Sequence, residues 1–322
     1  MINSMWSEVP ELRQQLQDVQ DLILEQLTFL DSMIANPIKQ QVLSGGKMIR
    51  PAFLLIFSDF GQADYQTRIK AAAAMEVLHL ATLIHDDVID DSKLRRNVET
   101  IQAHLGDRNA IYAGDYLMTV YFSLVSEVAN SRDDLLLNAS GMKKILRGEL
   151  DQLKMNYNPE ATTKMYLREI AGKTAQLIEL SAQFGAVLAH STPHLIHHAR
   201  FIGHNIGMSF QIEDDILDYR GDEQTGKPQL EDLKNGVYTI PLILAMQLDP
   251  ELWQFLQGKK NLSDDEVAHV AQQVQDCGGL AAAQALAKKY SQKALVLIED
   301  LPANHYKKYM SWLTRKLLKR HQ

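Results

Sequence analysis

Two acidic segments of the same form stand out in this chain. Each reads I-x-D-D, then two apolar residues, then D; they span Ile84–Asp90 and Ile212–Asp218. Residues four apart share a helix face at about 5–6 Å, so Asp86 faces the same way as Asp90, and Asp214 the same way as Asp218. Like charges at that spacing destabilise a helix, and the macrodipole opposes them near a C-terminus. Magnesium, which typically takes one or two carboxylates plus substrate phosphates, offsets both effects.

The simpler alternative is that each acidic segment is a solvated helix end, since one short motif often matches by chance. Two copies, both flanked by apolar residues, favour one chemical device used twice. The segments therefore predict a magnesium-dependent site, with several ions, for a substrate that carries phosphates.

Basic residues accompany these carboxylates and could clamp a diphosphate, as arginine forks and lysine ammonium groups commonly do. They occur in four places: Lys93 with Arg95 and Arg96, Lys173 beside Thr174, Lys227 in Gly226–Pro228, and Lys47 with Arg50 in Gly45–Pro51. A surface cation is the ordinary explanation for any one of them. Lys47 and Arg50 stand apart because the two preceding glycines let the backbone approach an anion closely.

Helices must position these residues, because helical periodicity runs through almost the whole chain. The predicted helices are Leu12–Leu30, Ile69–Asp91, Ala110–Val128, Leu135–Leu153, Thr163–His190, His194–Tyr219, Asp264–Val274, Leu280–Glu299 and Ala303–Lys319. No sustained alternation of apolar and polar residues predicts a strand. The mostly polar segment Arg220–Gly236 is long for a connection and is a candidate lid. With no shift in composition along the chain, we expect one all-α domain over residues 1–322.

The composition excludes several classes of protein. Apolar residues make up 46% of the 322 residues, enough for a sizeable core, and the lone Cys277 permits no intrachain disulfide and fits a reducing cytoplasm. A net charge of -7 argues against general nucleic-acid binding. Neither a signal peptide nor a transmembrane segment is expected, since the N-terminus lacks an apolar stretch and the apolar run Ile240–Met246 is too short to span a bilayer.

Together these motifs resemble those of the trans-prenyl diphosphate synthases, over Gly45 to about Met246. The matching segments are G-G-K-x-x-R-P at Gly45–Pro51, the first aspartate motif with Arg95-Arg96, Lys173-Thr174, F-Q-x-x-D-D-x-x-D at Phe210–Asp218, and G-K-P at Gly226–Pro228. The resemblance implies an isoprenoid synthase type I fold, a single-domain helical bundle around a central apolar cavity. It also implies a cytoplasmic, magnesium-dependent enzyme that joins isopentenyl diphosphate to an allylic diphosphate, head to tail and in the trans configuration.

Roles for individual residues also follow from the resemblance. It implies that Lys47, Arg50, His79 and Arg96 bind isopentenyl diphosphate, although His79 taken alone reads as an ordinary core histidine. It implies that Asp86, Asp90 and Asp214 hold magnesium. The allylic diphosphate would be contacted by Arg95, Lys173, Thr174, Gln211 and Lys227. The implied catalytic residues are Asp86, Asp87, Asp90, Asp214, Asp215, Asp218 and Lys173.

Two positions near the first motif bear on product length. In the family, bulky aromatic residues four or five positions before the motif stop chain growth early, and this chain has Ala81 and Thr82 there. The resemblance therefore implies a product longer than farnesyl, with hexaprenyl or heptaprenyl expected and geranylgeranyl or farnesyl as the alternative. The other interpretation is that Ala81 only packs against a helix and a deeper side chain sets the length.

The closest subgroup resemblance is to the larger, catalytic subunit of bacterial heteromeric hexaprenyl and heptaprenyl diphosphate synthases. It implies either a homodimer or a heterodimer with a small regulatory subunit, and a chain active only with its partner is an alternative. One departure is Val237 after Gly236, where the family often has lysine. A class I terpene cyclase is the rival enzyme, but it would not need the basic residues assigned to isopentenyl diphosphate.

Overall fold

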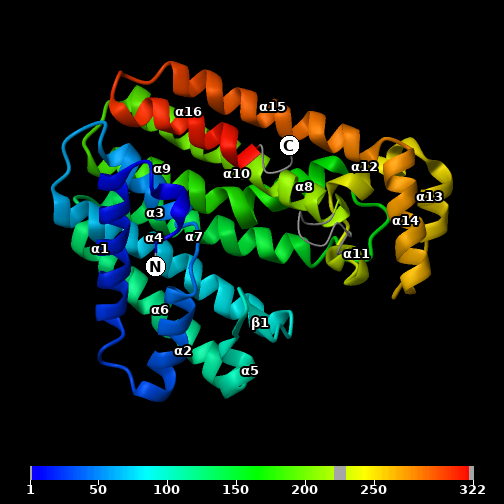
Figure 1. Ribbon diagram of the computed structural model, residues 1–322, viewed down its shortest axis with the longest axis horizontal. Helices are drawn as coiled ribbons and strands as arrows, with labels where there is room; N and C mark the ends of the chain where they lie inside the picture. Colours follow the sequence, from blue (N-terminus) through cyan, green and yellow to red (C-terminus); the bar gives the residue numbers. More distant parts are fainter. Residues whose placement is uncertain (1, 221–229, 319–322) are drawn as a thin grey trace. The chain divides into compact units, whose positions relative to one another are not determined.

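The structure is a computed structural model that describes residues 2–220 and 230–318, and its regular structure is nearly all helical (Figure 1). The predicted all-α class is confirmed. Contacts divide the chain into two compact units. Unit 1 comprises residues 1–140 and 180–200, and unit 2 comprises residues 141–179 and 201–322. Three helices have residues in both units: α7 (Arg132–Gln152), α9 (Gln176–Leu188) and α10 (Pro193–Arg220).

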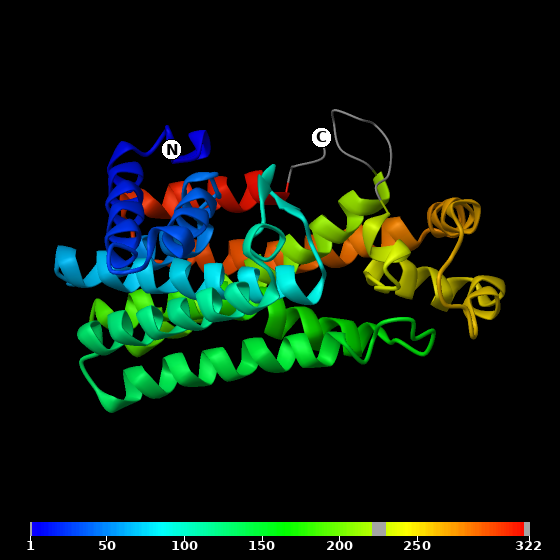
Figure 2. The same cartoon turned by 90° about the horizontal axis from the view of Figure 1, so that it is seen from below.

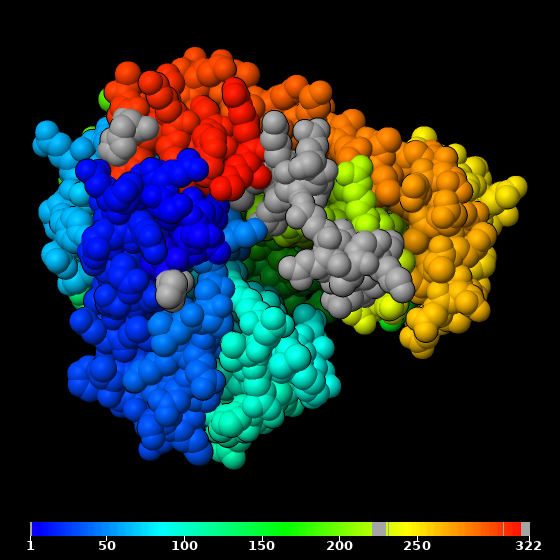
Figure 3. All heavy atoms as spheres, viewed as in Figure 1, coloured from blue at the N-terminus to red at the C-terminus, as the bar shows by residue number. Residues whose placement is uncertain are grey.

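Unit 1 is built around one long buried helix, α4 (Tyr65–Ile89). Its other elements are η1 (Ser4–Trp6), α1 (Pro10–Gln26), α2 (Ser32–Leu43), α3 (Ile49–Ser58), β1 (Leu94–Arg95), β2 (Val98–Glu99), α5 (Ile101–Leu105) and α6 (Asp107–Val128). Helices α1, α3 and α6 all pack against α4, and Figure 2 shows α6 running alongside it. Side chains of α1, α2 and α5 form the outer surface on the side of unit 1 seen in Figure 3.

Helix α4 forms where the sequence predicts it because its signals agree. The Asp64 side chain accepts a hydrogen bond from the backbone N–H of Thr67 at 3.0 Å, a standard N-cap. The run Ala71–Ala74 is fully buried, and small side chains let neighbouring helices approach closely. A helix that is buried on nearly all sides can place the first acidic motif, at its C-terminal end, against the protein interior.

A β-hairpin follows α4, where the sequence predicts no strand. Its two-residue strands pair antiparallel, with Leu94 opposite Glu99 and Arg95 opposite Val98. The turn residues Arg96 and Asn97 both have positive φ, 53° and 61°, as a type I′ turn requires. Strands of two residues are too short to show an alternation of apolar and polar residues. The sequence therefore did not predict a hairpin around Arg95 and Arg96.

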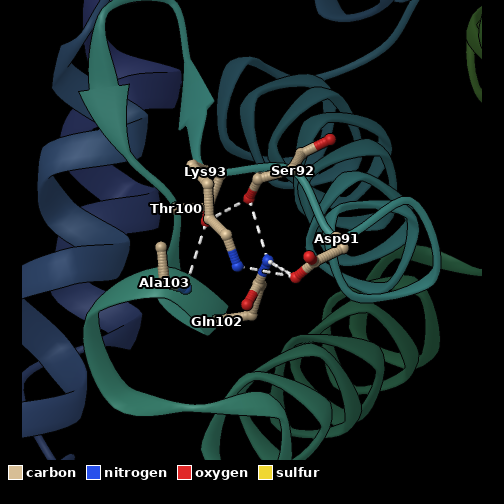
Figure 4. A network of polar contacts seen from close by, with 6 residues as sticks. All are labelled: Asp91, Ser92, Lys93, Thr100, Gln102 and Ala103. Atoms are coloured by element: carbon tan, nitrogen blue, oxygen red, sulfur yellow. Dashed lines mark hydrogen bonds and ion pairs between the residues drawn. The ribbon is translucent and has the colours of Figure 1, made fainter.

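Buried polar side chains fix the base of this hairpin (Figure 4). The Thr100 hydroxyl donates to the Ser92 carbonyl at 2.6 Å, and the Gln102 amide donates to the same carbonyl at 3.0 Å and to Asp91 at 3.1 Å. Thr100 and Gln102 are 0% and 5% exposed. Buried, satisfied polar groups of this kind hold one geometry, so the hairpin presents its arginines from a fixed base.

Unit 2 contains the remaining elements. They are α8 (Thr163–Ile170), the π turn η2 (Ala171–Ala175), α11 (Glu231–Lys234), α12 (Ile240–Leu248), α13 (Pro250–Leu256), α14 (Asp264–Asp276), α15 (Gly279–Glu299) and α16 (His305–Leu318). The apolar run predicted to be too short for a membrane span is α12, which packs against α13, α14 and α15 in the core of this unit. Among the described residues, no helix combines the length and apolar character needed to cross a bilayer.

The helix predicted over Thr163–His190 is observed over Thr163–Leu188, but it contains a π turn that the sequence did not predict. The π turn η2 separates α8 from α9, and it contains Lys173 and Thr174. Single π turns often occur at functional sites because they re-aim side chains within a helix. Within the described residues, six short α-helices were not predicted: α2, α3, α5, α11, α12 and α13. Four of them, α2, α3, α12 and α13, contain a proline.

Candidate functional site

The first acidic motif ends α4 and presents its aspartates in two ways. Asp86 is half-buried and Asp90 is exposed, and the Asp90 N–H donates to the Asp86 carbonyl at 2.8 Å to close the helix. Asp87 is 1% exposed. Its Oδ1 accepts hydrogen bonds from Arg95 Nε at 2.8 Å and Nη2 at 2.6 Å. The hairpin therefore places Arg95 against the buried aspartate.

Asp87 carries a further, unused acceptor. Its Oδ2 is buried and has no hydrogen-bond donor among the described residues. Burial raises the pKa of the Asp87 carboxyl, and the Arg95 guanidinium only partly opposes that shift. An orphaned carboxylate oxygen beside Asp86 and Asp90 forms an oxygen-only donor set, which fits Mg²⁺.

The second acidic motif lies in the last turns of α10, in unit 2. Asp214 is half-buried, and burial raises its pKa to about 7, with the nearby charges of Glu213 and Asp232 adding to the shift. Asp232 belongs to α11. Concentrated acid of this kind is destabilising unless a cation offsets it. Within residues 2–220 and 230–318, no group of three or more His, Cys, Asp and Glu side chains is placed to hold a metal ion.

Asp215, the middle aspartate of this motif, is 2% exposed, and both its oxygens are occupied. The Tyr166 hydroxyl donates to Oδ2 at 2.5 Å, and the Gln211 amide donates to Oδ1 at 2.8 Å. The other end of the Gln211 amide accepts from the Thr174 hydroxyl at 2.7 Å. Burial raises the pKa of Asp215 well above its usual range. A continuous chain of hydrogen bonds thus joins η2 to the acidic motif.

The two motifs therefore share a pattern that the sequence alone does not reveal. In each, the second aspartate is buried and held by side chains of the same unit, while the first and last are more accessible. We propose that Asp87 and Asp215 position their motifs and that Asp86, Asp90, Asp214 and Asp218 face the ligand. All six were predicted to be catalytic, and that prediction stays untested.

Lys173 is held by two residues of α7. Its ammonium donates to Gln152 Oε1 at 2.6 Å and lies 3.0 Å from Glu149 Oε2. Two glycines let the backbones of α7 and η2 approach closely. A Cβ on Gly148 would lie 2.3 Å from the backbone nitrogen of Lys173, and a Cβ on Gly172 would lie 2.8 Å from the Cα of Gly148. The close helix contact therefore fixes the π turn and the lysine within it.

Sequence reasoning missed Glu169, which lies on α8 one turn before Lys173. It is 7% exposed, and burial raises its pKa to about 8, with Lys173 opposing the shift. The spacing of four residues from Lys173 was the available signal.

In unit 1, three of the residues predicted to bind isopentenyl diphosphate lie together. A pocket is lined by residues that include Gly46, Met48, Glu76, His79, Leu83 and Arg96. Arg50 lies near enough to Glu76 and Arg96 for their charges to affect its pKa, which burial lowers to about 10. Burial and the nearby arginines hold the pKa of His79 well below its usual range, so its ring is neutral at pH 7.

The remaining predicted residues are more scattered. Lys47 is half-buried, and its carbonyl accepts a hydrogen bond from Trp6 Nε1 at 2.7 Å. Ala81 is fully buried in the unit 1 core. Thr82 is half-buried, and its hydroxyl donates a hydrogen bond to the His79 carbonyl at 2.8 Å. Lys227 and most of the candidate lid lie outside the described residues.

Comparisons with known proteins agree with this chemistry. A family model described as "Polyprenyl synthetase" matches residues 31–275. The chain is 38% identical to heptaprenyl diphosphate synthase component 2 of Geobacillus stearothermophilus, over 81% of the chain and 82% of the relative. Two solved structures cover nearly its full length. Geranylgeranyl pyrophosphate synthase from Lactobacillus brevis (42% identity, TM-score 0.93) covers 98% of this chain and 99% of that one, and heptaprenyl diphosphate synthase from Staphylococcus aureus (33%, 0.91) covers 97% and 99%.

Proposed function

Because the chain belongs to the polyprenyl synthetase family, we propose that it is a trans-polyprenyl diphosphate synthase that adds isopentenyl diphosphate to an allylic diphosphate. The observation that carries the proposal is the pair of matching acidic motifs, each with accessible outer aspartates and a buried, anchored middle one. The basic pocket in unit 1 supplies what a second, anionic substrate needs. A single domain over residues 1–322 is part of the proposal, supported by a family match that includes residues of both units.

The reaction breaks the allylic carbon–oxygen bond, and the diphosphate leaves with the electron pair. The isopentenyl double bond attacks the allylic carbon, and a proton is then lost, with the departing diphosphate as the proposed acceptor. The outer aspartates of each motif would hold magnesium, which would supply charge that offsets the charge on the leaving diphosphate. Lys173, oriented by Glu149 and Gln152, and Thr174, oriented by Gln211, position that leaving group. Such pre-oriented donors lower the barrier because they need no rearrangement when charge develops.

A two-substrate incubation tests the reaction class against a terpene cyclase. The protein is incubated with farnesyl diphosphate and magnesium, with or without isopentenyl diphosphate. We expect farnesyl diphosphate to be consumed only when isopentenyl diphosphate is present. Its conversion to a hydrocarbon without the second substrate would instead establish a cyclase.

We infer a product of hexaprenyl or heptaprenyl length. The small residues Ala81 and Thr82 support it, and the relative from Geobacillus stearothermophilus is named for a heptaprenyl product. The similar Lactobacillus brevis structure is of a geranylgeranyl pyrophosphate synthase, which keeps geranylgeranyl as the alternative.

Thr82→Phe is expected to shorten the product by at least one isoprene unit, because a bulky ring at this half-buried position would obstruct the growing chain. Ala81→Phe is less informative, since Ala81 is fully buried and overpacking a core typically costs about 1–3 kcal/mol. Chromatography of the dephosphorylated products measures the change, with Thr82→Ser as the control that keeps the site small. An unchanged product from a stable Thr82→Phe variant would place the length-setting residue elsewhere.

We also propose a partner, either a second copy or a small regulatory subunit. The name "component 2" of the Geobacillus stearothermophilus relative supports a heteromeric assembly. Helix α7 adds support, because Leu146, Leu150 and Leu153 are 53%, 61% and 62% exposed at i, i+4, i+7 spacing. An exposed apolar stripe at that spacing is typical of a helix that packs against a partner. A cytoplasmic location completes the proposal, supported by the single cysteine.

A further inference from the structure

Glu76 is the only acidic residue among those that line the pocket in the described part of unit 1. It lies on α4 three residues before His79, so the two side chains share a helix face. Its Oε2 is buried and has no hydrogen-bond donor among the described residues. A buried carboxylate is costly unless other charges compensate it.

The compensating charges are two arginines that do not contact it directly. Within residues 2–220 and 230–318, no ion pair within 4.0 Å joins Glu76 to Arg50 or Arg96, and the buried Nε of Arg50 has no acceptor. Arg96 lies against the backbone, because a Cβ on Gly46 would meet its Nη1 at 2.8 Å. Burial raises the pKa of Glu76, and the charges of Arg50 and Arg96 oppose that shift. Burial lowers the pKa of Arg50 to about 10, and the charge of Glu76 opposes that shift. Glu76 therefore acts on the guanidinium groups through its field and leaves their N–H donors available.

This arrangement has a consequence for an incoming anion. One carboxylate and two guanidinium groups leave the pocket with one net positive charge, because His79 is neutral. The two arginines attract a diphosphate and Glu76 repels it, so the carboxylate makes anion binding weaker than the arginines alone would allow. In the free protein the same carboxylate relieves the repulsion between the half-buried Arg50 and the exposed Arg96.

We propose that Glu76 is a positioning residue, an internal counter-charge to Arg50 and Arg96 that limits how tightly the pocket holds a diphosphate. The proposal rests on the proposed function for its purpose. In chain elongation the diphosphate of each new isopentenyl unit becomes that of the lengthened chain, which must leave this pocket before the next unit enters. A pocket that held diphosphate too tightly would slow every cycle.

Titration with inorganic pyrophosphate in EDTA tests the proposal, since chelation removes metal-dependent binding at the aspartate motifs. We expect Glu76→Gln to bind pyrophosphate about tenfold more tightly than the wild type at low salt. Its affinity should also fall more steeply as salt rises, because salt screens the additional net charge. Arg96→Ala, which removes one of the two guanidinium groups, should lose most of the binding and so locate it in this pocket. Weaker or unchanged binding by Glu76→Gln would overturn the proposal, because it would mean that Glu76 helps to bind the anion or has no effect on it.

Two further variants separate charge from shape and from stability. Glu76→Asp keeps the charge and should bind pyrophosphate within about twofold of the wild type; a tenfold loss would show that the carboxylate acts through direct contacts. Glu127→Gln removes an exposed carboxylate paired with Lys70 at 2.7 Å, and its pyrophosphate affinity should not change.

Turnover adds a readout that a purely structural role would not move. Glu76→Gln should lower both KM for isopentenyl diphosphate and kcat, because tighter retention slows each cycle. The pyrophosphate titration needs no turnover. A protein that fails to elongate any substrate but keeps the predicted order of pyrophosphate affinities would refute the proposed function and leave this inference standing. If the wild type does not bind pyrophosphate, the inference fails, and the two-substrate incubation still judges the function.

Discussion

Replacing Asp86 or Asp214 by alanine is expected to lower kcat about a hundredfold to a thousandfold, with little change in folding. Each removes an accessible carboxylate from a motif whose buried partner, Asp87 or Asp215, keeps its own hydrogen bonds. Loss of one electrostatic contact to a developing charge typically costs this much. Steady-state kinetics with saturating isopentenyl and allylic diphosphates measures the effect.

Raised magnesium should restore part of the lost activity, because weakened metal binding is the physical cause. Asp21→Ala is a suitable control, since Asp21 is an exposed carboxylate on α1 that accepts only a hydrogen bond from Gln17 at 2.9 Å among the bonds of the described chain. Retention of more than about a tenth of wild-type kcat by either variant at low magnesium would contradict the assignment of its motif.

Arg50→Gln is expected to raise KM for isopentenyl diphosphate about 10- to 100-fold and to leave KM for the allylic substrate within about twofold. A hydrogen bond to a charged group contributes about 1.5–3 kcal/mol, and each 1.4 kcal/mol is a factor of ten. Arg50 is the residue to test because its buried Nε has no acceptor in the described chain and the charges of Glu76 and Arg96 affect its pKa.

Varying each substrate in turn separates the two KM values. Arg13→Gln, an exposed arginine of α1, is the matched control and should behave as the wild type. Equal increases in both KM values would mean that Arg50 supports the whole site, and an unchanged KM for isopentenyl diphosphate would remove Arg50 from the pocket's binding groups.

The sequence predicts the long helices well because their signals repeat over many residues. The helix predicted over Ile69–Asp91 is observed as Tyr65–Ile89, and that predicted over His194–Tyr219 is observed as Pro193–Arg220. Both acidic motifs therefore stand near helix ends, where the sequence predicts them. Helical spacing alone also placed Asp86 with Asp90 and Asp214 with Asp218.

What the sequence could not predict depends on contacts between distant residues. The π turn at Lys173 depends on Gly148, a residue of another helix. The burial of Asp87 and Asp215 depends on Arg95, Tyr166 and Gln211, which local periodicity cannot bring together.

The role of Glu76 could not be predicted from the sequence either. The sequence shows that Glu76 lies three residues before His79. A carboxylate in a helix is nevertheless expected to be solvent-exposed unless its neighbours in the fold are known. The hairpin that carries Arg95 and Arg96 is fixed by Thr100 and Gln102, whose buried hydrogen bonds also leave no pattern in the sequence.

Metal binding coupled to diphosphate tests the central claim most directly, namely that the outer aspartates of each acidic motif bind metal ions together with a diphosphate. Manganese in place of magnesium can be counted by electron paramagnetic resonance, with and without a non-hydrolysable allylic diphosphate analogue. We expect weak manganese binding to the free protein and tight binding of several ions with the analogue, with fewer ions bound in Asp86→Ala and in Asp214→Ala. Tight binding without the analogue, or an ion count that either substitution leaves unchanged, would contradict that claim.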